Sequence, residues 1–232
     1  MRTRASERGG GVMSDAVQLS DAIGEKTQRL ASRRLGRQFS PDHIFHLAEG
    51  ENLKSILEQG LMSTAKLVAR QALPDQEKAA LLRGHRSTHL RLQGTLIRDQ
   101  VPMPPAALAP ALDDGMEPGD WYVLVNEHVF FWPDRERLDR HSKACSSRPQ
   151  YLMTYDAAKL FNDFGDRAYV SPINSGNARR KPARRGRDTF LPYQTWIEHG
   201  WPTGQRNRRP AEFLFRCDVP VTPPYLLSVE SL

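Results

Sequence analysis

The sequence has few cysteines and no long apolar run. Cys145 and Cys217 are its only cysteines, too few for a disulfide framework and too far apart for a metal site. We therefore expect two free thiols, no metal and a reducing cytoplasm. No segment approaches the roughly 20 apolar residues that a membrane-spanning helix needs. Residues 1–12 lack the apolar core of a secretory signal, so we expect neither export nor a membrane partner.

Negative charge is in the minority. The chain of 232 residues holds 33 Lys and Arg against 27 Asp and Glu, a net charge of +6. This suits a polyanionic partner, and it equally fits an ordinary basic enzyme. Six cations fall within residues 179–187, which have no apolar spacing and predict a solvated loop. That loop is either a flexible basic surface or a nucleic-acid contact made through Arg179, Arg180, Arg184, Arg185 and Arg187.

The periodicity predicts short elements of both kinds. Residues 1–40 form a polar, Arg-rich extension that is partly helical or disordered, and residues 41–232 form one domain. Strands and short helices interleave without a regular βαβ period, which predicts an α+β fold with a split, largely antiparallel sheet. We expect strands at 43–47, 95–98, 129–132, 150–155, 168–173 and 211–216, and helices at 52–60, 65–72, 75–82, 121–126, 134–143 and 156–161.

Three local features sharpen this outline. The dense apolar segment 129–132 predicts a central strand. Asp120 can cap the helix that precedes it. The proline-rich segment 99–110 is expected to be neither a regular helix nor a central strand.

A lone carboxylate lies within the last apolar run. In a strand over 211–216, Glu212 would share a face with Leu214 and Arg216, near the rim of the sheet. A carboxylate there stays ionised only if an arginine or a ligand hydroxyl satisfies it, which makes Glu212 a candidate catalytic residue. The alternative is an edge-strand glutamate that faces water.

The first predicted strand leads directly into a short helix. His46 alternates with apolar neighbours in the strand, Asn52 can cap the helix, and Gly60 can end it in a left-handed conformation.

These two ends of the chain together resemble the DarT-like branch of the ADP-ribosyltransferases. The matching segments are 44–47, 52–57 and 209–214, followed by Val219 and Pro220. The segments between them are more similar to a family of uncharacterised bacterial proteins, through the motifs at 98–103, 124–132 and 171–178. The resemblance covers roughly residues 43–225 and implies an ADP-ribosyltransferase-like domain over 41–232.

The resemblance implies transfer of ADP-ribose from NAD, used as a co-substrate without a metal. It gives Glu212 the role of hydrogen-bonding the ribose and activating the acceptor, and His46 that of holding NAD. Asn52 would also contact the cofactor, with a simple helix cap as its structural alternative. His46 could equally be a structural histidine.

An arginine that clamps NAD and a polar turn complete the implied site. Arg86 is the first candidate for the clamp and Arg83 the second, because both precede the 98–102 landmark; either could be a surface arginine instead. Asn174 lies in a turn that could reach NAD or the acceptor, although asparagine is also common in turns for conformational reasons.

The chain departs from the DarT pattern in ways that leave the acceptor open. Ala48 and Glu49 replace the threonine and histidine that often follow the first motif, and 103–106 replaces an aromatic-rich segment. The resemblance implies a toxin or defence effector that modifies a base in single-stranded DNA and is paired with an antitoxin. A protein or small-molecule acceptor, an NAD glycohydrolase, and a non-enzymatic nucleic-acid-binding protein on the same fold are the alternatives.

Overall fold

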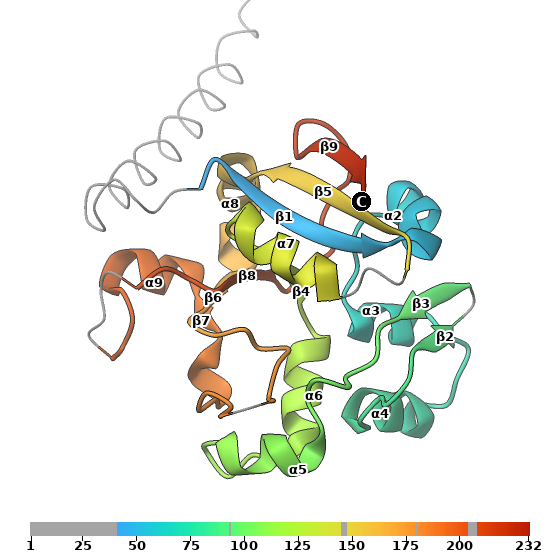
Figure 1. The fold of residues 1–232 in the computed structure, drawn as a ribbon, viewed down its shortest axis with the longest axis vertical. Helices are drawn as coiled ribbons and strands as arrows, with labels where there is room; N and C mark the ends of the chain where they lie inside the picture. The colour runs from blue at the N-terminus through green and yellow to red at the C-terminus, as the bar shows by residue number, and fades with distance from the viewer. Residues whose placement is uncertain (1–40, 93, 145–147, 180, 204–207) are drawn as a thin grey trace, which may run out of the picture. The chain divides into compact units, whose positions relative to one another are not determined.

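The computed structural model describes residues 41–232 except 93, 145–147, 180 and 204–207, so the expected extension at 1–40, Cys145 and Arg180 lie outside the described residues. Residues 41–232 form one unit of short helices and antiparallel sheets, which confirms the α+β prediction (Figure 1). Within this unit, no helix is long and apolar enough to cross a bilayer.

The strands follow the predicted positions closely, with three additions at β2, β7 and β9. They are β1 (His43–Glu49), β2 (Leu90–Leu92), β3 (Thr95–Ile97), β4 (Val129–Phe131), β5 (Gln150–Asp156), β6 (Ala168–Ser171), β7 (Leu191–Pro192), β8 (Glu212–Phe215) and β9 (Leu226–Ser231).

The helices are short, and α5 and α9 were not predicted. They are α2 (Leu53–Gln59), α3 (Thr64–Ala69), α4 (Asp75–Arg83), α5 (Pro105–Leu108), α6 (Pro118–Asn126), α7 (Arg135–Ala144), α8 (Ala157–Phe164) and α9 (Tyr193–His199). Single 3-10 turns occur at Gly50–Asn52, Ala109–Ala111, Gly165–Arg167 and Arg187–Thr189.

The first sheet has the order β1-β5-β9 and is antiparallel throughout. In its register His46 lies opposite Met153, and Ile44 lies opposite Tyr155. Ile44, Met153 and Tyr155 are fully buried. The sheet therefore holds the first predicted motif rigidly against the core.

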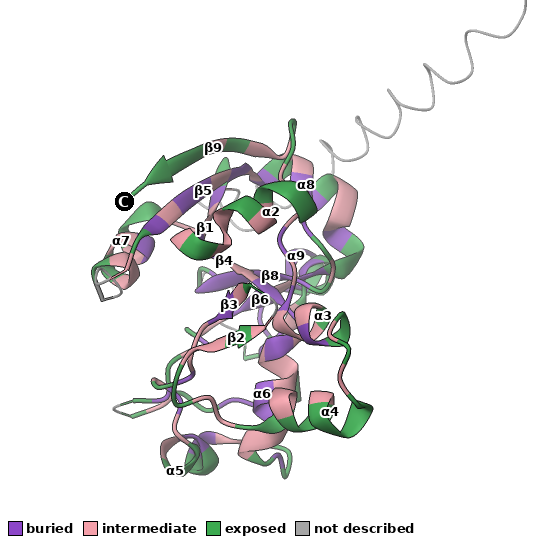
Figure 2. Ribbon diagram, turned by 90° about the vertical axis from the view of Figure 1, so that its right-hand side faces the viewer, coloured by how far each residue is buried: buried purple, intermediate pink, exposed green. Residues whose placement is uncertain are grey.

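The second sheet has the order β4-β8-β6-β7 and lies between the first sheet and α6 (Figures 1 and 2). All four residues of β8 are buried because both of its faces are covered. The prediction for β4 is therefore wrong, because β4 is the end strand rather than a central one. Strand β8 is an inner strand, which excludes the edge-strand alternative for Glu212. An isolated bridge between Phe45 and Trp132 joins the two sheets.

Aromatic side chains pack the space around β8. Phe161 of α8 stacks on Tyr193 of α9, with ring centroids 4.2 Å apart, and contacts Phe213 at 5.0 Å. Phe215 contacts Phe131 at 5.5 Å. Burying rings of this size contributes much of the stability of a small domain. The strand that carries Glu212 is consequently among the best-anchored parts of the fold.

Local chemistry explains two differences from the predicted helix ends. Glu117, not Asp120, is the N-cap of α6; Asp120 is the third residue of the helix, and its carboxylate accepts from the Glu117 backbone N–H at 2.9 Å. The proline-rich segment contains the single-turn helix α5, because Pro105 at its first position needs no N–H partner.

Gly60 ends α2 with a positive φ, as predicted, but its ψ of 172° places it outside the left-handed helical region. Gly60 has φ of +88°, and a side chain there would meet the Val219 carbonyl at 3.0 Å. Leu61 then pairs with Val219 in a β-bridge. This contact ties the first motif to the segment that follows β8.

Candidate functional site

A cavity of about 720 Å³ lies where the two sheets meet the loops that follow β3 and β6. It is large enough for a small-molecule ligand or cofactor. Six of the residues predicted for the site line it: His46, Asn52, Arg86, Asn174, Arg179 and Glu212. His46 and Glu212 are 166 positions apart in the chain, and the fold brings both to one space.

Glu212 is a buried acid at the start of β8, with only 5% of its surface exposed. Its Oε2 accepts a hydrogen bond from the Ser175 backbone N–H at 3.1 Å. Burial raises the pKa of Glu212 to about 7, although hydrogen bonding from Ser175 and the charges of Arg185 and Arg137 oppose the rise. The interpretation of an edge glutamate facing water is therefore wrong, and the carboxyl can bind or release a proton near neutral pH.

Arg185 holds the loop that bonds Glu212. It is 2% exposed and donates to the carbonyl oxygens of Ser175 at 3.0 Å, Asn177 at 2.9 Å and Ala183 at 3.0 Å. Its guanidinium carbon lies 5.3 Å from the centre of the Trp121 ring. A nucleic-acid contact through Arg185 is excluded by this burial, which corrects the prediction for that residue.

His46 presents a neutral imidazole to the cavity. Its Nδ1–H donates to the Phe130 carbonyl oxygen at 2.9 Å, which leaves Nε2 as the acceptor. Burial, together with the charge of Arg98, lowers the pKa of His46 to about 4, although the bond to Phe130 works in the other direction. The ring also packs against Phe131, at 5.7 Å between centroids. Strand β1 thus delivers a hydrogen-bond acceptor with a defined tautomer.

Asn52 lines the cavity but does not cap a helix through its side chain. Its amide forms two 2.8 Å hydrogen bonds with the backbone N–H and C=O of Leu96 in β3. Asn52 occupies the N-cap position of α2, as predicted, but it makes no cap hydrogen bond, because pairing with the end of β3 satisfies both polar atoms of the amide. Asn52 therefore fixes the position of the cavity wall.

Of the two arginines proposed for the clamp, only Arg86 lines the described cavity. It is half-buried, and its guanidinium donates to Asn126 Oδ1 and to the Arg98 carbonyl, each at 3.1 Å. Arg83 instead makes an exposed ion pair with Asp120 at 2.8 Å on the outside of α4 and α6. Arg83 is therefore a surface residue, which corrects its prediction as a site residue.

An ion-pair cluster in the same wall was not predicted as part of the site. Glu49 is 4% exposed and accepts from Arg148 Nε and Nη2, each at 3.1 Å, and from Arg98 Nε. Burial alone would raise the pKa of Glu49, but the bonds and charges of Arg148 and Arg98 hold it below its usual value. Arg98 Nη1 also lies 3.1 Å from His141 Nε2. The sequence carries one sign of this cluster, which is that Glu49 stands where the DarT pattern often has a histidine.

The basic loop does not act as one surface. Arg179 is exposed at the cavity, whereas Arg184 is exposed away from it and pairs with Asp113. Arg187 is also exposed, and its backbone N–H donates to Asp114 at 3.1 Å. The prediction of a uniformly solvated loop therefore holds at these three positions and fails at Arg185.

Comparison with known proteins shows which family the chain belongs to. No curated protein and no solved structure is detectably similar to this chain. A family described as being of unknown function, DUF7002, matches residues 42–226, which is most of the chain and nearly all of its described part. The chain is therefore a member of the DUF7002 family.

Proposed function

We propose that this protein is an NAD-dependent ADP-ribosyltransferase of the bacterial cytoplasm that modifies nucleic acid as a toxin or defence effector. The observation that carries the proposal is that His46 of β1 and Glu212 of β8 line one cavity together with Arg86. These are side chains to which the DarT-like resemblance gives roles with NAD.

The reaction breaks the bond between nicotinamide and C1 of the ribose. The ribose becomes positive in an oxocarbenium-like transition state, as in glycoside hydrolysis. Nicotinamide leaves with the bonding electron pair, and the acceptor forms a new bond to C1 while losing its proton. An ionised Glu212 beside the ribose stabilises the positive charge and takes that proton. Its pKa of about 7 lets it gain and release a proton near neutral pH.

The other two side chains would bind NAD. His46 Nε2 can accept a hydrogen bond from a ribose hydroxyl, because its Nδ1–H is already bonded to Phe130. Arg86 brings a guanidinium to the same cavity, and such a group binds pyrophosphate oxygens well. Both residues are held by protein hydrogen bonds, so little side-chain freedom is lost when a ligand binds.

The fate of the ADP-ribose distinguishes transfer from hydrolysis. Purified full chain is incubated with NAD labelled in its adenylate, alone and with single-stranded DNA, RNA or a protein lysate. We expect label on the nucleic acid. Label released only as free ADP-ribose identifies an NAD glycohydrolase, label on protein identifies another acceptor, and unchanged NAD under all conditions contradicts the proposed enzyme.

A further inference from the structure

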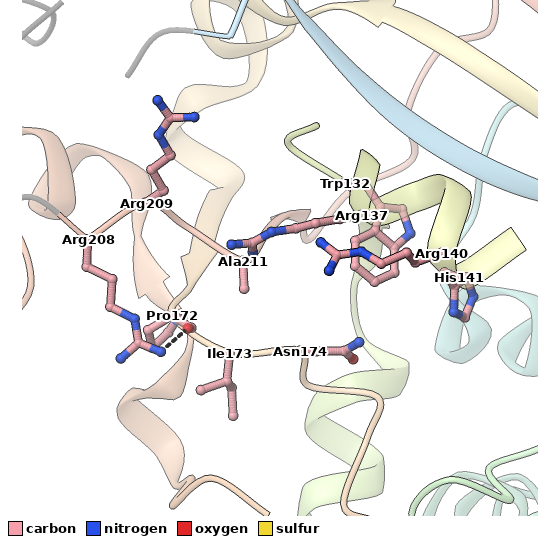
Figure 3. A pocket seen from close by; sticks show the side chains of 10 residues that line it. All are labelled: Trp132, Arg137, Arg140, His141, Pro172, Ile173, Asn174, Arg208, Arg209 and Ala211. Atoms are coloured by element: carbon pink, nitrogen blue, oxygen red, sulfur yellow. Dashed lines mark hydrogen bonds between the residues drawn. The ribbon is translucent and has the colours of Figure 1, made fainter. Parts of the chain in front are cut away.

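A second cavity, of about 810 Å³, shares part of its lining with the first. Figure 3 shows the side chains that line this second cavity. Four arginines line it, and none of its described lining residues is acidic. Arg137 and Arg140 come from α7 on one side, and Arg208 and Arg209 come from the chain before β8 on the other. No function assigned above uses these four residues. We call this space the arginine cavity.

The arrangement of the charges suits a ligand that carries several phosphates. In Figure 3, Arg137 and Arg140 extend from α7 toward the segment of Ala211, and Arg208 lies across from them. Arg208 Nη2 donates to the Pro172 carbonyl at 2.7 Å, which fixes that wall. Cations on two facing walls can contact successive phosphates of a strand, whereas a single monoanion would engage only one wall.

The arginines of α7 can exchange their present partners for a phosphate. Arg137 lies 3.3 Å from Asp134, and Arg140 lies 3.6 Å from Glu136. All four side chains are more than one third exposed, and Glu136 is 84% exposed. Exposed pairs within one helix contribute little stability, so a doubly contacted phosphate competes with them easily.

Three residues connect the arginine cavity with the cavity of Glu212. Trp132, His141 and Asn174 line both spaces. The charge of Arg137 is also close enough to Glu212 to lower the pKa of that carboxyl, against the larger effect of burial. A ligand held by the arginines would therefore extend toward the proposed reaction centre.

The shared residue Trp132 supplies an aromatic surface at this junction. It is half-buried, and its ring lies 5.2 Å from that of His141. Arginines that track a backbone, combined with an aromatic ring for stacking, are typical of proteins that bind single-stranded nucleic acid. Bases in a duplex are already stacked on one another, so this ring favours an unpaired strand.

We propose that the arginine cavity binds the sugar–phosphate backbone of a single-stranded nucleic acid, with one base stacked on Trp132 beside the cavity of Glu212. The inference rests on the proposed function and identifies where its acceptor enters. It also moves the predicted nucleic-acid contact from the basic loop at 179–187 to α7 and the segment before β8, with Arg179 near the junction.

Binding is measured without NAD, by the fluorescence anisotropy of a labelled twelve-residue oligothymidylate on the full chain. The test variant is Arg137→Gln/Arg140→Gln. The matched control is Arg70→Gln/Arg167→Gln, which removes the same charge at two exposed arginines outside both cavities.

We expect the test variant to bind at least about tenfold more weakly. The slope of log affinity against log salt should fall by about 1.4, the value for two lost phosphate contacts on a single strand. An equal loss in both variants would show that only net charge matters and would overturn the site.

Stacking is tested separately at Trp132. Trp132→Leu should weaken oligothymidylate binding by between about 5-fold and about 150-fold, while Trp132→Phe keeps a ring and most of the affinity. Near-native circular dichroism of both variants shows that they fold. Equal affinity for oligothymidylate and for a duplex of the same length, or an equal loss in both Trp132 variants, would contradict a stacked single strand. Displacement of the strand by a phosphopeptide at lower concentration would show that the cavity serves a protein.

The outcomes separate this inference from the proposed function. Glu212→Gln should bind the oligonucleotide like the unaltered chain, because the acid lies outside the arginine cavity. Strand binding without NAD consumption would refute the enzyme and keep the binding site. NAD consumption without strand binding would refute the binding site and keep the proposed enzyme.

Discussion

The backbone N–H of Ser175 donates a 3.1 Å hydrogen bond to the carboxylate of Glu212. The carbonyl of the same residue accepts from the buried guanidinium of Arg185 at 3.0 Å. The loop after β6 is thus fixed between an acid on one side and an arginine on the other. Any change that releases this loop should alter both the position of Glu212 and its affinity for protons.

Arg185 is therefore expected to act as a positioning residue. Replacing it with Met removes three hydrogen bonds and a nearby positive charge, so the pKa of Glu212 should rise further. We expect NAD consumption at pH 7 to fall by about 100-fold, with the midpoint of the pH–rate profile moved to higher pH. The matched control is Arg184→Met in the same loop, which loses an exposed pair with Asp113 and an exposed hydrogen bond to the Pro110 carbonyl, and should remain within about twofold. A slower Arg185→Met enzyme with an unmoved pH midpoint would indicate a merely structural defect.

The ionisation of Glu212 should set the pH dependence of catalysis. The carboxylate must be ionised to stabilise the ribose and take a proton, so kcat/KM should rise with pH through a midpoint near 7. A profile with its only rise near pH 4.5 would contradict a buried Glu212 as the catalytic group.

The same pKa has a consequence for stability. Because the folded state holds the Glu212 proton more tightly than the unfolded state, the contribution of this group to stability is present below about pH 4.5 and is lost as pH rises through about 7. Glu212→Gln removes this loss. Relative to the unaltered chain, the variant should gain on the order of 3 kcal/mol in free energy of unfolding between pH 4.5 and pH 8. Urea denaturation at the two pH values measures it, and a pH-independent difference would refute the elevated pKa.

Binding of NAD should distinguish the two candidate arginines. Arg86→Gln removes a guanidinium from the cavity and should raise KM for NAD by at least about tenfold, the cost of one charge-assisted hydrogen bond. Arg83→Gln removes only surface pairs with Asp120 and Glu117 and should change KM by less than about twofold. Steady-state kinetics at fixed pH compares them. A larger rise in KM for NAD in Arg83→Gln than in Arg86→Gln would assign the NAD-binding role to Arg83.

His46 gives a test that relies on its neutral state. Its pKa of about 4 means that the folded state resists protonation, so its contribution to stability is present above about pH 6.5 and is lost as pH falls toward 4. In His46→Gln, stability should depend less steeply on pH within that window, and NAD should bind about tenfold more weakly. Equal slopes in urea denaturation from pH 6.5 to 4 would show that His46 is not held neutral.

Local patterns were sufficient to predict much of the fold. The alternation of His46 with apolar neighbours places β1, and the run around Glu212 places β8, because both signals are read within a few residues. Strand order cannot be predicted from such local signals. That β8 is an inner strand depends on β4 and β6 pairing with it from segments about 40 to 85 positions earlier, which no local pattern encodes.

The site was harder to predict wherever a side chain depends on a distant partner. Arg185 has the same local composition as Arg184, and only the ring of Trp121 and the carbonyls of the 175–177 loop make it a buried structural group. Arg137 and Arg140 look like ordinary charges on a solvated helix. They become part of a cavity only because Arg208, some 70 positions later, lies across from them.

The measurement that bears most directly on the central claim is NAD consumption by the full chain and by Glu212→Gln, with Glu127→Gln, a glutamate that pairs with Arg216 outside both cavities, as the matched control. We expect the unaltered chain and Glu127→Gln to release nicotinamide at similar rates, and Glu212→Gln to be slower by at least about 100-fold. Equal rates in all three proteins would contradict the catalytic assignment of Glu212 and the function built on it.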